Sequence, residues 1–110
     1  TASGNVDVGI YSSDFTKIIS SGSTAQAGTN DLQVFDVTDT TIGPGDFYLA
    51  IALDNGTGTV FTQNLTVAIG RRSGLLQMAS AFPLPATITP ATISAGTCPL
   101  VGLRQGGTAI

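Results

Sequence analysis

The chain alternates apolar and polar residues in several short runs, the pattern typical of β-strands. The clearest run is Val6–Ser12, in which the two valines and the isoleucine occupy every second position. Ser12-Ser13-Asp14 then predicts a tight turn into a second strand over Phe15–Ser20. The same period of two returns in Asp46–Asp54. These runs predict antiparallel strands, with the first two joined in a hairpin.

The run Asp46–Asp54 is predicted to lie in the centre of a sheet. Its reverse face carries the small residues Ala50 and Ala52, which allow another layer to approach closely. Leu49 and Ile51, on the other face, are then expected in the core. The Asn-Gly dipeptide that follows is a strong hairpin signal, because both positions favour positive φ. The next strand is therefore expected to pair with this one.

Less regular runs complete the expected strands. A short strand is expected around Ser23–Gln26, inside a polar loop. In Leu32–Thr38 the apolar phase slips by one residue, which favours a β-bulge. Thr59–Ile69 is the expected hairpin partner of Asp46–Asp54. Pro83–Gly96 is expected to hold an edge strand whose prolines prevent open pairing. The last strand is expected over Pro99–Arg104.

A family resemblance rests on the strands and turns of the first half. Asn5–Ser21, the turn Ile42-Gly43-Pro44-Gly45 and the run Asp46–Asp54 resemble a jelly-roll domain of structural proteins in tailed bacteriophages and their prophages. The resemblance implies an all-β antiparallel β-sandwich of jelly-roll type. It also implies a virion component, attached to the tail or the capsid beside other virion proteins. No catalytic or cofactor residue is carried over, since the matching residues are strands and turns.

The composition points to contacts between subunits. Residues 1–110 are short enough for one domain, with 42% hydrophobic and only 10% charged residues, against roughly 25% charged in an average soluble domain. Low charge together with exposed apolar area is what an assembly interface presents. We therefore expect a closed homo-oligomer, with a trimer as the expected state.

The charged residues argue against nucleic acid as a partner. The net charge is −3, all seven acidic residues are Asp, and the cations are Lys17, Arg71, Arg72 and Arg104. Phosphate binding needs a cluster of several cations, which these four do not provide. The sequence holds no uninterrupted apolar run of about 18 residues, so no membrane segment is expected. Cys98 is the only cysteine and is expected to be a small buried residue.

Catalytic chemistry lacks its usual residues. The chain has no histidine, so the common hydrolytic triads and histidine metal sites are excluded within it. The pairs Asp36 with Asp39 and Asp46 with Asp54 could act as paired carboxylates. The segments Asp36–Asp39 and Asp54–Thr57 could instead offer oxygen ligands to calcium. Each Asp also sits where it would cap a turn, which is the preferred interpretation. The sequence predicts no enzyme and no cofactor.

Two sets of residues are candidates for binding. The stretches Leu75–Phe82 and Pro83–Ile93 are the expected contact surfaces of the homo-oligomer. The candidate partner-binding residues are Leu75, Leu76, Met78, Phe82, Arg71 and Arg72. The alternative function is a carbohydrate- or receptor-binding jelly-roll module for host recognition. Its candidate residues are Tyr11, Gln33, Asp36, Asn55 and Gln63.

Without the irregular segments the count is six or seven strands, fewer than the eight of a jelly roll, and the phage domains that the chain resembles carry further strands ahead of the corresponding hairpin. Two explanations are open. The 110 residues are the C-terminal part of a longer product, or another chain lends a strand by β-augmentation beside Val6–Ile10.

Overall fold

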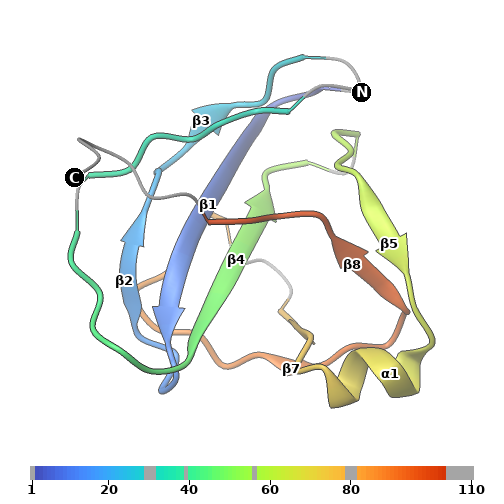
Figure 1. Ribbon diagram of the computed structural model, residues 1–110. Coiled ribbons are helices and arrows are strands. Elements are labelled where there is room, and N and C mark those ends of the chain that lie inside the picture. The colour runs from blue at the N-terminus through green and yellow to red at the C-terminus, as the bar shows by residue number, and fades with distance from the viewer. Residues whose placement is uncertain (1, 29–31, 39, 56, 79–81, 104–110) are drawn as a thin grey trace.

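The computed structural model describes residues 2–28, 32–38, 40–55, 57–78 and 82–103. The protein is mostly β, and every strand pair is antiparallel (Figure 1). The elements are β1 (Asn5–Ser12), β2 (Lys17–Ser20), β3 (Thr24–Ala25), β4 (Phe47–Leu53), β5 (Thr62–Asn64), α1 (Val67–Arg72), β6 (Leu76–Gln77), β7 (Ala91–Thr92) and β8 (Thr97–Pro99). The all-β class is thus confirmed, while the jelly-roll arrangement stays a prediction.

β1 is the middle strand of the main sheet. It pairs with β2 and β3 along one edge and with β4 along the other. The β1–β4 register runs from Val6 opposite Leu53 to Ser12 opposite Phe47. The β1–β2 hairpin is confirmed, but the central position predicted for Asp46–Asp54 is wrong. Among the described residues β4 pairs with β1 alone, and its small alanines lie opposite Gly9 and Asp7.

The turn between β1 and β2 is closed by polar side chains. The Ser12 hydroxyl donates to the Asp14 carboxylate, and the Phe15 amide donates to the Ser12 carbonyl oxygen at 3.0 Å. Phe15 has a φ of 67°, a value that no strand residue adopts. The strand predicted over Phe15–Ser20 therefore begins at Lys17.

The core is built around β1, which is covered on both faces. Val6 and Ile10 are buried on one face, and Asp7 and Tyr11 on the other. Gly9 shares the second face, and a Cβ on it would lie 3.0 Å from Leu84 Cδ1, so Leu84 packs directly on the glycine. The core predicted around Leu49 is wrong, because 41% of that side chain is exposed.

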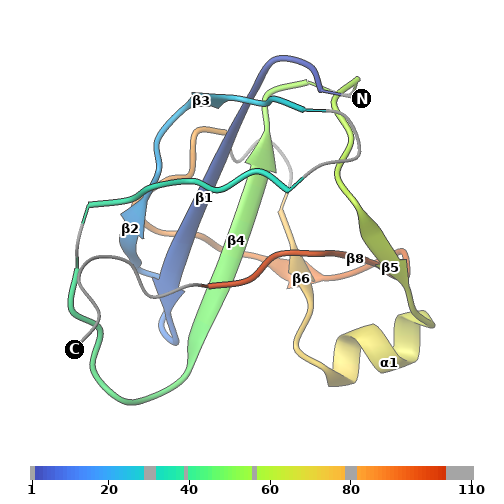
Figure 2. The ribbon, with the colours of Figure 1, turned by 45° about the horizontal axis from the view of Figure 1, so that its top comes forward.

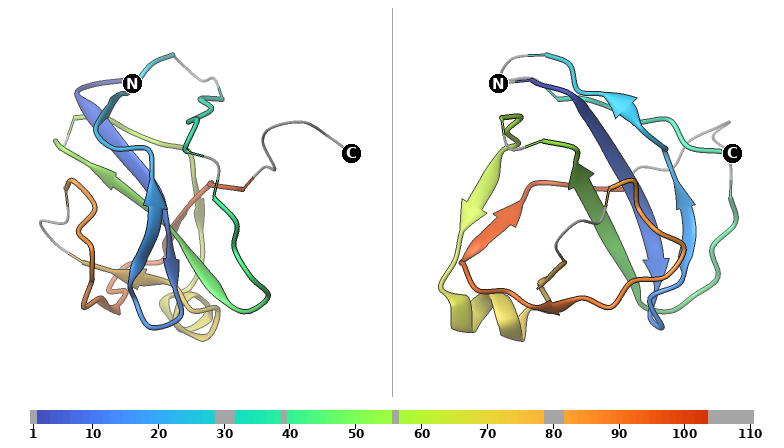
Figure 3. Two further views of the ribbon diagram at one scale, coloured as in Figure 1. Left: turned by 90° about the vertical axis from the view of Figure 1, so that its left-hand side faces the viewer. Right: turned by 180° about the vertical axis from the view of Figure 1, so that it is seen from behind.

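The main sheet lies between two layers of irregular chain. On one side, residues 84–88 are held to the β1–β2 hairpin, where the Lys17 amide donates to Ala86 O at 2.7 Å and the Ile88 amide to Phe15 O at 3.1 Å. On the other side, residues 32–38 and 100–103 cross the sheet (Figure 2). Figure 3 shows the sheet edge-on between the two layers.

The hairpin predicted between Asp46–Asp54 and Thr59–Ile69 does not form. Asn55 Oδ1 accepts the amides of Thr57 at 2.8 Å and Gly58 at 2.7 Å, and this side-chain turn directs the chain away from β4. β5 pairs with β8 instead. Beyond β5, the Thr66 hydroxyl accepts the Ile69 amide at 3.2 Å and caps α1, where the sequence predicted strand.

Other predicted strands are shorter or absent in the described residues. Thr24–Ala25 confirms the short strand expected near Ser23–Gln26. Leu32–Thr38 forms no strand, and the last strand ends at Pro99. The proline-rich stretch contributes only β7 and a bridge from Thr87 to Thr16.

Two further expectations can be placed on this fold. Cys98 lies in β8 and is only half-buried, so the full burial expected for it is wrong. No helix in the described part of the chain is long and apolar enough to cross a bilayer.

Candidate functional site

A wide apolar groove covers one face of the main sheet. Its floor includes Val6, Val8 and Ile10 of β1 and Leu49 and Ile51 of β4. Its other walls come from residues 32–38, 59–61 and 100–103, and its volume is about 1330 Å³. Leu49 and Ile51 are two positions apart in β4 and share this face, so the period of two in the sequence accounts for their place in the groove.

The walls of this groove leave large apolar side chains in contact with solvent. The exposed fraction is 86% for Leu32, 57% for Phe61, 65% for Leu100 and 60% for Leu103. Asp36 is the one charged residue in the described lining. Such a concentration of exposed apolar side chains is typical of an interaction site.

A second hollow lies on the opposite face of the sheet. Its volume is about 770 Å³, and Tyr48, Leu84 and Ile93 are among the residues that line it. The rings of Tyr48 and Phe15 are in contact, with centroids 5.2 Å apart. Four residues of the predicted partner surface also lie here: Leu75, Leu76, Met78 and Phe82. The structure thus brings the apolar members of that surface together.

The two arginines of the predicted partner surface lie apart from this hollow. Both are exposed in the last turn of α1. Arg71 donates from Nε to the Ile93 carbonyl oxygen at 3.1 Å, so it also holds the helix against β7 and its neighbours. Arg72 keeps its side chain on the surface.

The five residues predicted to bind a glycan do not form one surface. Tyr11 is completely buried and donates its hydroxyl to Pro85 O. Gln33 holds a loop by donating to Ala25 O and accepting from the Ala27 amide, each at 2.9 Å. Asn55 donates from Nδ2 to Ser3 O at 2.9 Å and accepts the Thr57 amide with Oδ1 in the turn after β4. Only Asp36 and Gln63 are exposed, on separate segments.

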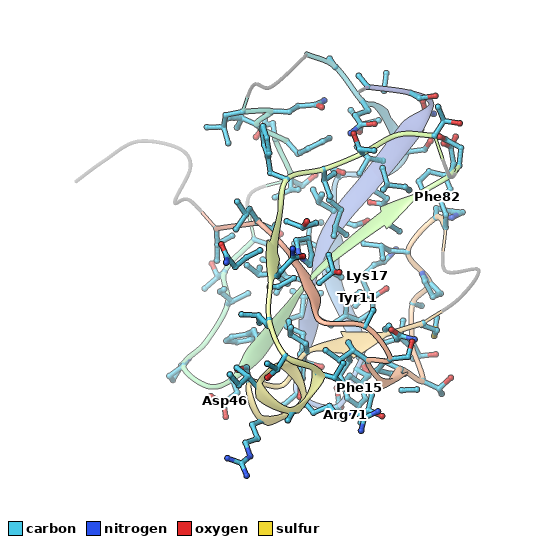
Figure 4. The ribbon with its side chains drawn as sticks, turned by 90° about the vertical axis from the view of Figure 1, so that its right-hand side faces the viewer. Tyr11, Phe15, Lys17, Asp46, Arg71 and Phe82 are labelled. Carbon is cyan, nitrogen blue, oxygen red and sulfur yellow. The ribbon has the colours of Figure 1, made fainter. Side chains whose placement is uncertain are left out.

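A buried polar cluster ties the second half of the chain to β1. Asp7 is 1% exposed, and its Oδ2 accepts the Leu84 amide at 3.0 Å. Lys17 Nζ donates to Leu84 O at 3.0 Å. Burial raises the pKa of Tyr11, and the negative charge of Asp7 raises it further. In Figure 4 Tyr11 and Lys17 lie near the middle of the view and Asp46 at its margin; Tyr11 is buried and Lys17 half-buried.

Two other carboxylates, those of Asp14 and Asp54, are held by hydrogen bonds at the ends of strands. Hydrogen bonds from the Asn55 side chain and the Asn5 amide hold the pKa of Asp54 below its usual value. Hydrogen bonds from Ser12 and Thr16 lower the pKa of Asp14 in the same way. Asp54 accepts a backbone N–H, but that of Asn5 at the start of β1; the turn after β4 is closed by Asn55 Oδ1 instead. Within the described residues no three acidic, cysteine or histidine side chains gather as metal ligands, and Asp39 lies outside that part of the chain.

Sequence reasoning missed the walls of the larger groove. The signal was present in the phase slip of Leu32–Thr38, which left apolar residues on both faces, and in the run Leu100–Leu103 near the C-terminus. Nothing in the pattern of Val6–Ser12 indicated that Asp7 would be buried. Comparison of the chain with protein-family models, with curated proteins and with solved structures finds no match in any of the three.

Proposed function

We propose that this chain is a non-enzymatic structural component of a tailed-phage virion, attached to the tail or the capsid and acting through subunit contacts. In its working state it forms a closed homo-oligomer, a trimer. The observation that carries the proposal is the apolar groove with its exposed Leu32, Phe61, Leu100 and Leu103. The phage setting and the jelly-roll arrangement of the complete domain come from the resemblance of the first half.

Free energy favours covering this groove. Removing apolar surface from water stabilises a protein by about 25 cal/mol per Å². The groove lining holds one described charge, so burying it carries little cost of desolvating ions. A groove of this size left in water would promote non-specific association, and regular subunit contacts avoid that outcome.

The positions of the candidate glycan residues favour the architectural role over host-receptor binding. Sugar recognition needs polar side chains that converge on one accessible surface. Tyr11 is buried, while Gln33 and Asn55 are engaged in local hydrogen bonds. The two exposed candidates, Asp36 and Gln63, belong to different segments. A glycan array on the purified protein should therefore give no specific binding.

Sedimentation tests the oligomer. We expect a species of three times the chain mass of 11.1 kDa at micromolar concentration. Phe61→Ser, which removes an exposed apolar side chain, should shift it toward the monomer, whereas Thr62→Ser next to it should not. A stable monomer of the unaltered chain would contradict the oligomer. Antibodies to the purified protein should then label particles from its native source in electron micrographs, and unlabelled particles would contradict the virion role.

A further inference from the structure

The outer edge of β4 is open in the part of the chain that the structure describes. β4 pairs with β1 alone. Hydrogen-bonding direction alternates along an antiparallel pair. Val8 O accepts the Ser21 amide on the β2 side, whereas Asn5 O accepts the Asp54 amide on the β4 side. Val8 and Ile51 are thus a non-hydrogen-bonded pair. By the same alternation, the residues whose N–H and C=O groups point away from β1 are Phe47, Leu49, Ile51 and Leu53.

The two hollows meet along this edge. Leu49 and Ile51 line both the groove of about 1330 Å³ and the hollow of about 770 Å³. Beyond the edge stand β5 and β8, which form a separate sheet (Figures 1 and 3). An apolar strand of seven residues with an unpaired edge is a template for another strand.

We infer that an extended, uncharged segment of another virion protein adds to the outer edge of β4 as a strand. Its side chains alternate between the two hollows, because successive residues of a strand point to opposite faces. A segment of about seven residues matches the length of β4. The inference rests on the proposed function and names the partner of the groove.

The chemistry of the edge specifies a polypeptide. Backbone donors and acceptors repeat along β4 at strand spacing, and another strand satisfies them all at once. A small apolar ligand would leave these groups unpaired, and the larger hollow exceeds the roughly 300–1,000 Å³ typical of small-molecule sites. Asp36 and Asp54 are the charged residues in the described linings of the two hollows. An anionic segment would therefore meet no opposite charge there, and a cationic one at most two carboxylates, so an uncharged segment fits best.

The surroundings of the edge favour a single inserted strand over a second copy of this chain. To lay its own β4 alongside, a second copy would have to displace β5 and β8 (Figure 1). One extended segment needs only the space between the two hollows. The strand that the sequence predicted to be lent beside Val6–Ile10 has no place there, because β1 has partners on both edges. The open edge belongs to β4 instead.

The probe for this inference is a capped nine-residue peptide of alternating Val and Thr. The control peptide has the same length, with Pro at two adjacent central positions. Successive residues of a strand point their N–H groups to opposite edges, so each edge of the control peptide lacks one N–H group whichever way it binds. We expect calorimetry to show binding of the first peptide and about tenfold weaker binding of the second, the loss that about one hydrogen bond explains. On binding, exchange of the Leu49 and Ile51 amides should slow, while the Ala50 amide, already bonded to β1, should not change.

Substitution of Leu49 tests the role of the β4 edge in peptide binding. Leu49→Pro removes an outward N–H and should weaken peptide binding about tenfold. If it does not fold, Leu49→Lys, which places a charge on the edge, is used instead. Thr57→Lys, exposed and outside both hollows, is the control and should bind as the unaltered chain does.

Three results would overturn the inference: equal binding of both peptides, no binding of either, or Leu49 and Ile51 amides that become protected only as protein concentration rises. The last result would identify a second copy as the occupant. A trimer that forms without peptide binding would leave the proposed function standing and remove this inference alone. A monomer that binds no peptide would remove both.

Discussion

The sheet of the first half and the irregular second half of this molecule differ in how they reach stability. β1 and β4 pair over seven successive positions, and β1 is covered on both faces. In residues 57–103, by contrast, the strands are two or three residues long and their large side chains are often exposed, as at Phe61 and Leu100. Continuous strand pairing and burial on both faces make the sheet of β1 to β4 the frame of the molecule. The second half of the chain, which we call the cover, packs on this frame and leaves large apolar side chains exposed.

The frame and its cover are joined by hydrogen bonds and by apolar contacts, and the backbone bonds of Lys17 and Phe15 to residues 86 and 88 are among them. Asp7, Tyr11 and Lys17 each bond to the backbone of Leu84 or Pro85. Leu84 and Ile93 add the apolar contacts. Because the cover depends on these contacts, the free energy of opening should differ between the two regions.

The largest expected effect compares two residues that face each other across β1 and β4. Ile10 is 7% exposed and Leu49 is 41% exposed, and the two are direct register partners. Ile10→Ala should cost about 2–5 kcal/mol of unfolding free energy through a core cavity. Leu49→Ala should cost about 1 kcal/mol or less, because its side chain is already partly in water. Urea unfolding of both variants measures the two free-energy costs. Equal costs would mean that Leu49 contributes as much to the packed core as Ile10 does.

The next effect tests how the cover is attached. Asp7→Ala leaves the buried Leu84 amide without its acceptor and should cost about 1–3 kcal/mol. Asp7→Asn keeps an oxygen acceptor and should restore most of that loss. Thermal unfolding of the two variants is the measurement. If Asn is as destabilising as Ala, the carboxylate matters through its charge, and the hydrogen bond to Leu84 is not the anchor.

A smaller effect concerns the cover alone. Thr66→Ala removes the cap of α1 and should cost that helix about 1 kcal/mol. Because the cover opens separately, amide exchange should speed up at Ile69 and Gly70 while the amides of β1 keep their protection. Thr62→Ala, on an exposed position of β5, is the matched control. A uniform rise in exchange across β1 would instead mean that the two regions unfold as one unit.

The smallest effect is a dependence on pH at the end of β4. The folded pKa of Asp54 lies below the usual 3.8, so the stabilisation it gives is present above that value and is lost as pH falls through the lowered folded pKa. Asp54→Asn should therefore differ from the unaltered chain above about pH 4 and converge with it at lower pH. Urea unfolding between about pH 6 and pH 2 checks this sign. A difference that does not change with pH would contradict it.

The frame could be predicted from sequence and the cover could not, for a physical reason. Alternation in Val6–Ser12 and Asp46–Asp54 is a local signal that survives in β1 and β4. Whether β1 or β4 is the central strand depends on the segments that pair with each of them. Small residues such as Ala50 indicated that another part of the chain approaches β4 closely, but they did not identify that part. At Thr59–Ile69 the apolar period was outweighed by the Asn55 side-chain turn and by the Thr66 cap.

The candidate functional site also has one part that the sequence predicted and one part that it did not. Leu75, Leu76, Met78 and Phe82 were predicted as a contact surface from local composition, and they do line one hollow. The larger groove joins residues 32–38 to residues 100–103, a contact between distant segments that no local pattern contains. The burial of Tyr11 likewise depends on Pro85, 74 residues further along the chain.

The open outer edge of β4 is the central claim about this molecule, and native-state amide exchange tests that edge residue by residue. In the purified chain without peptide, the amides of Tyr48, Ala50 and Ala52, which face β1, should be protected. Those of Leu49, Ile51 and Leu53, which face away, should exchange with little protection. Alternating protection along β4 is the predicted result. Equal, concentration-independent protection at all six amides would show that the edge is already paired within the chain, and would contradict the account.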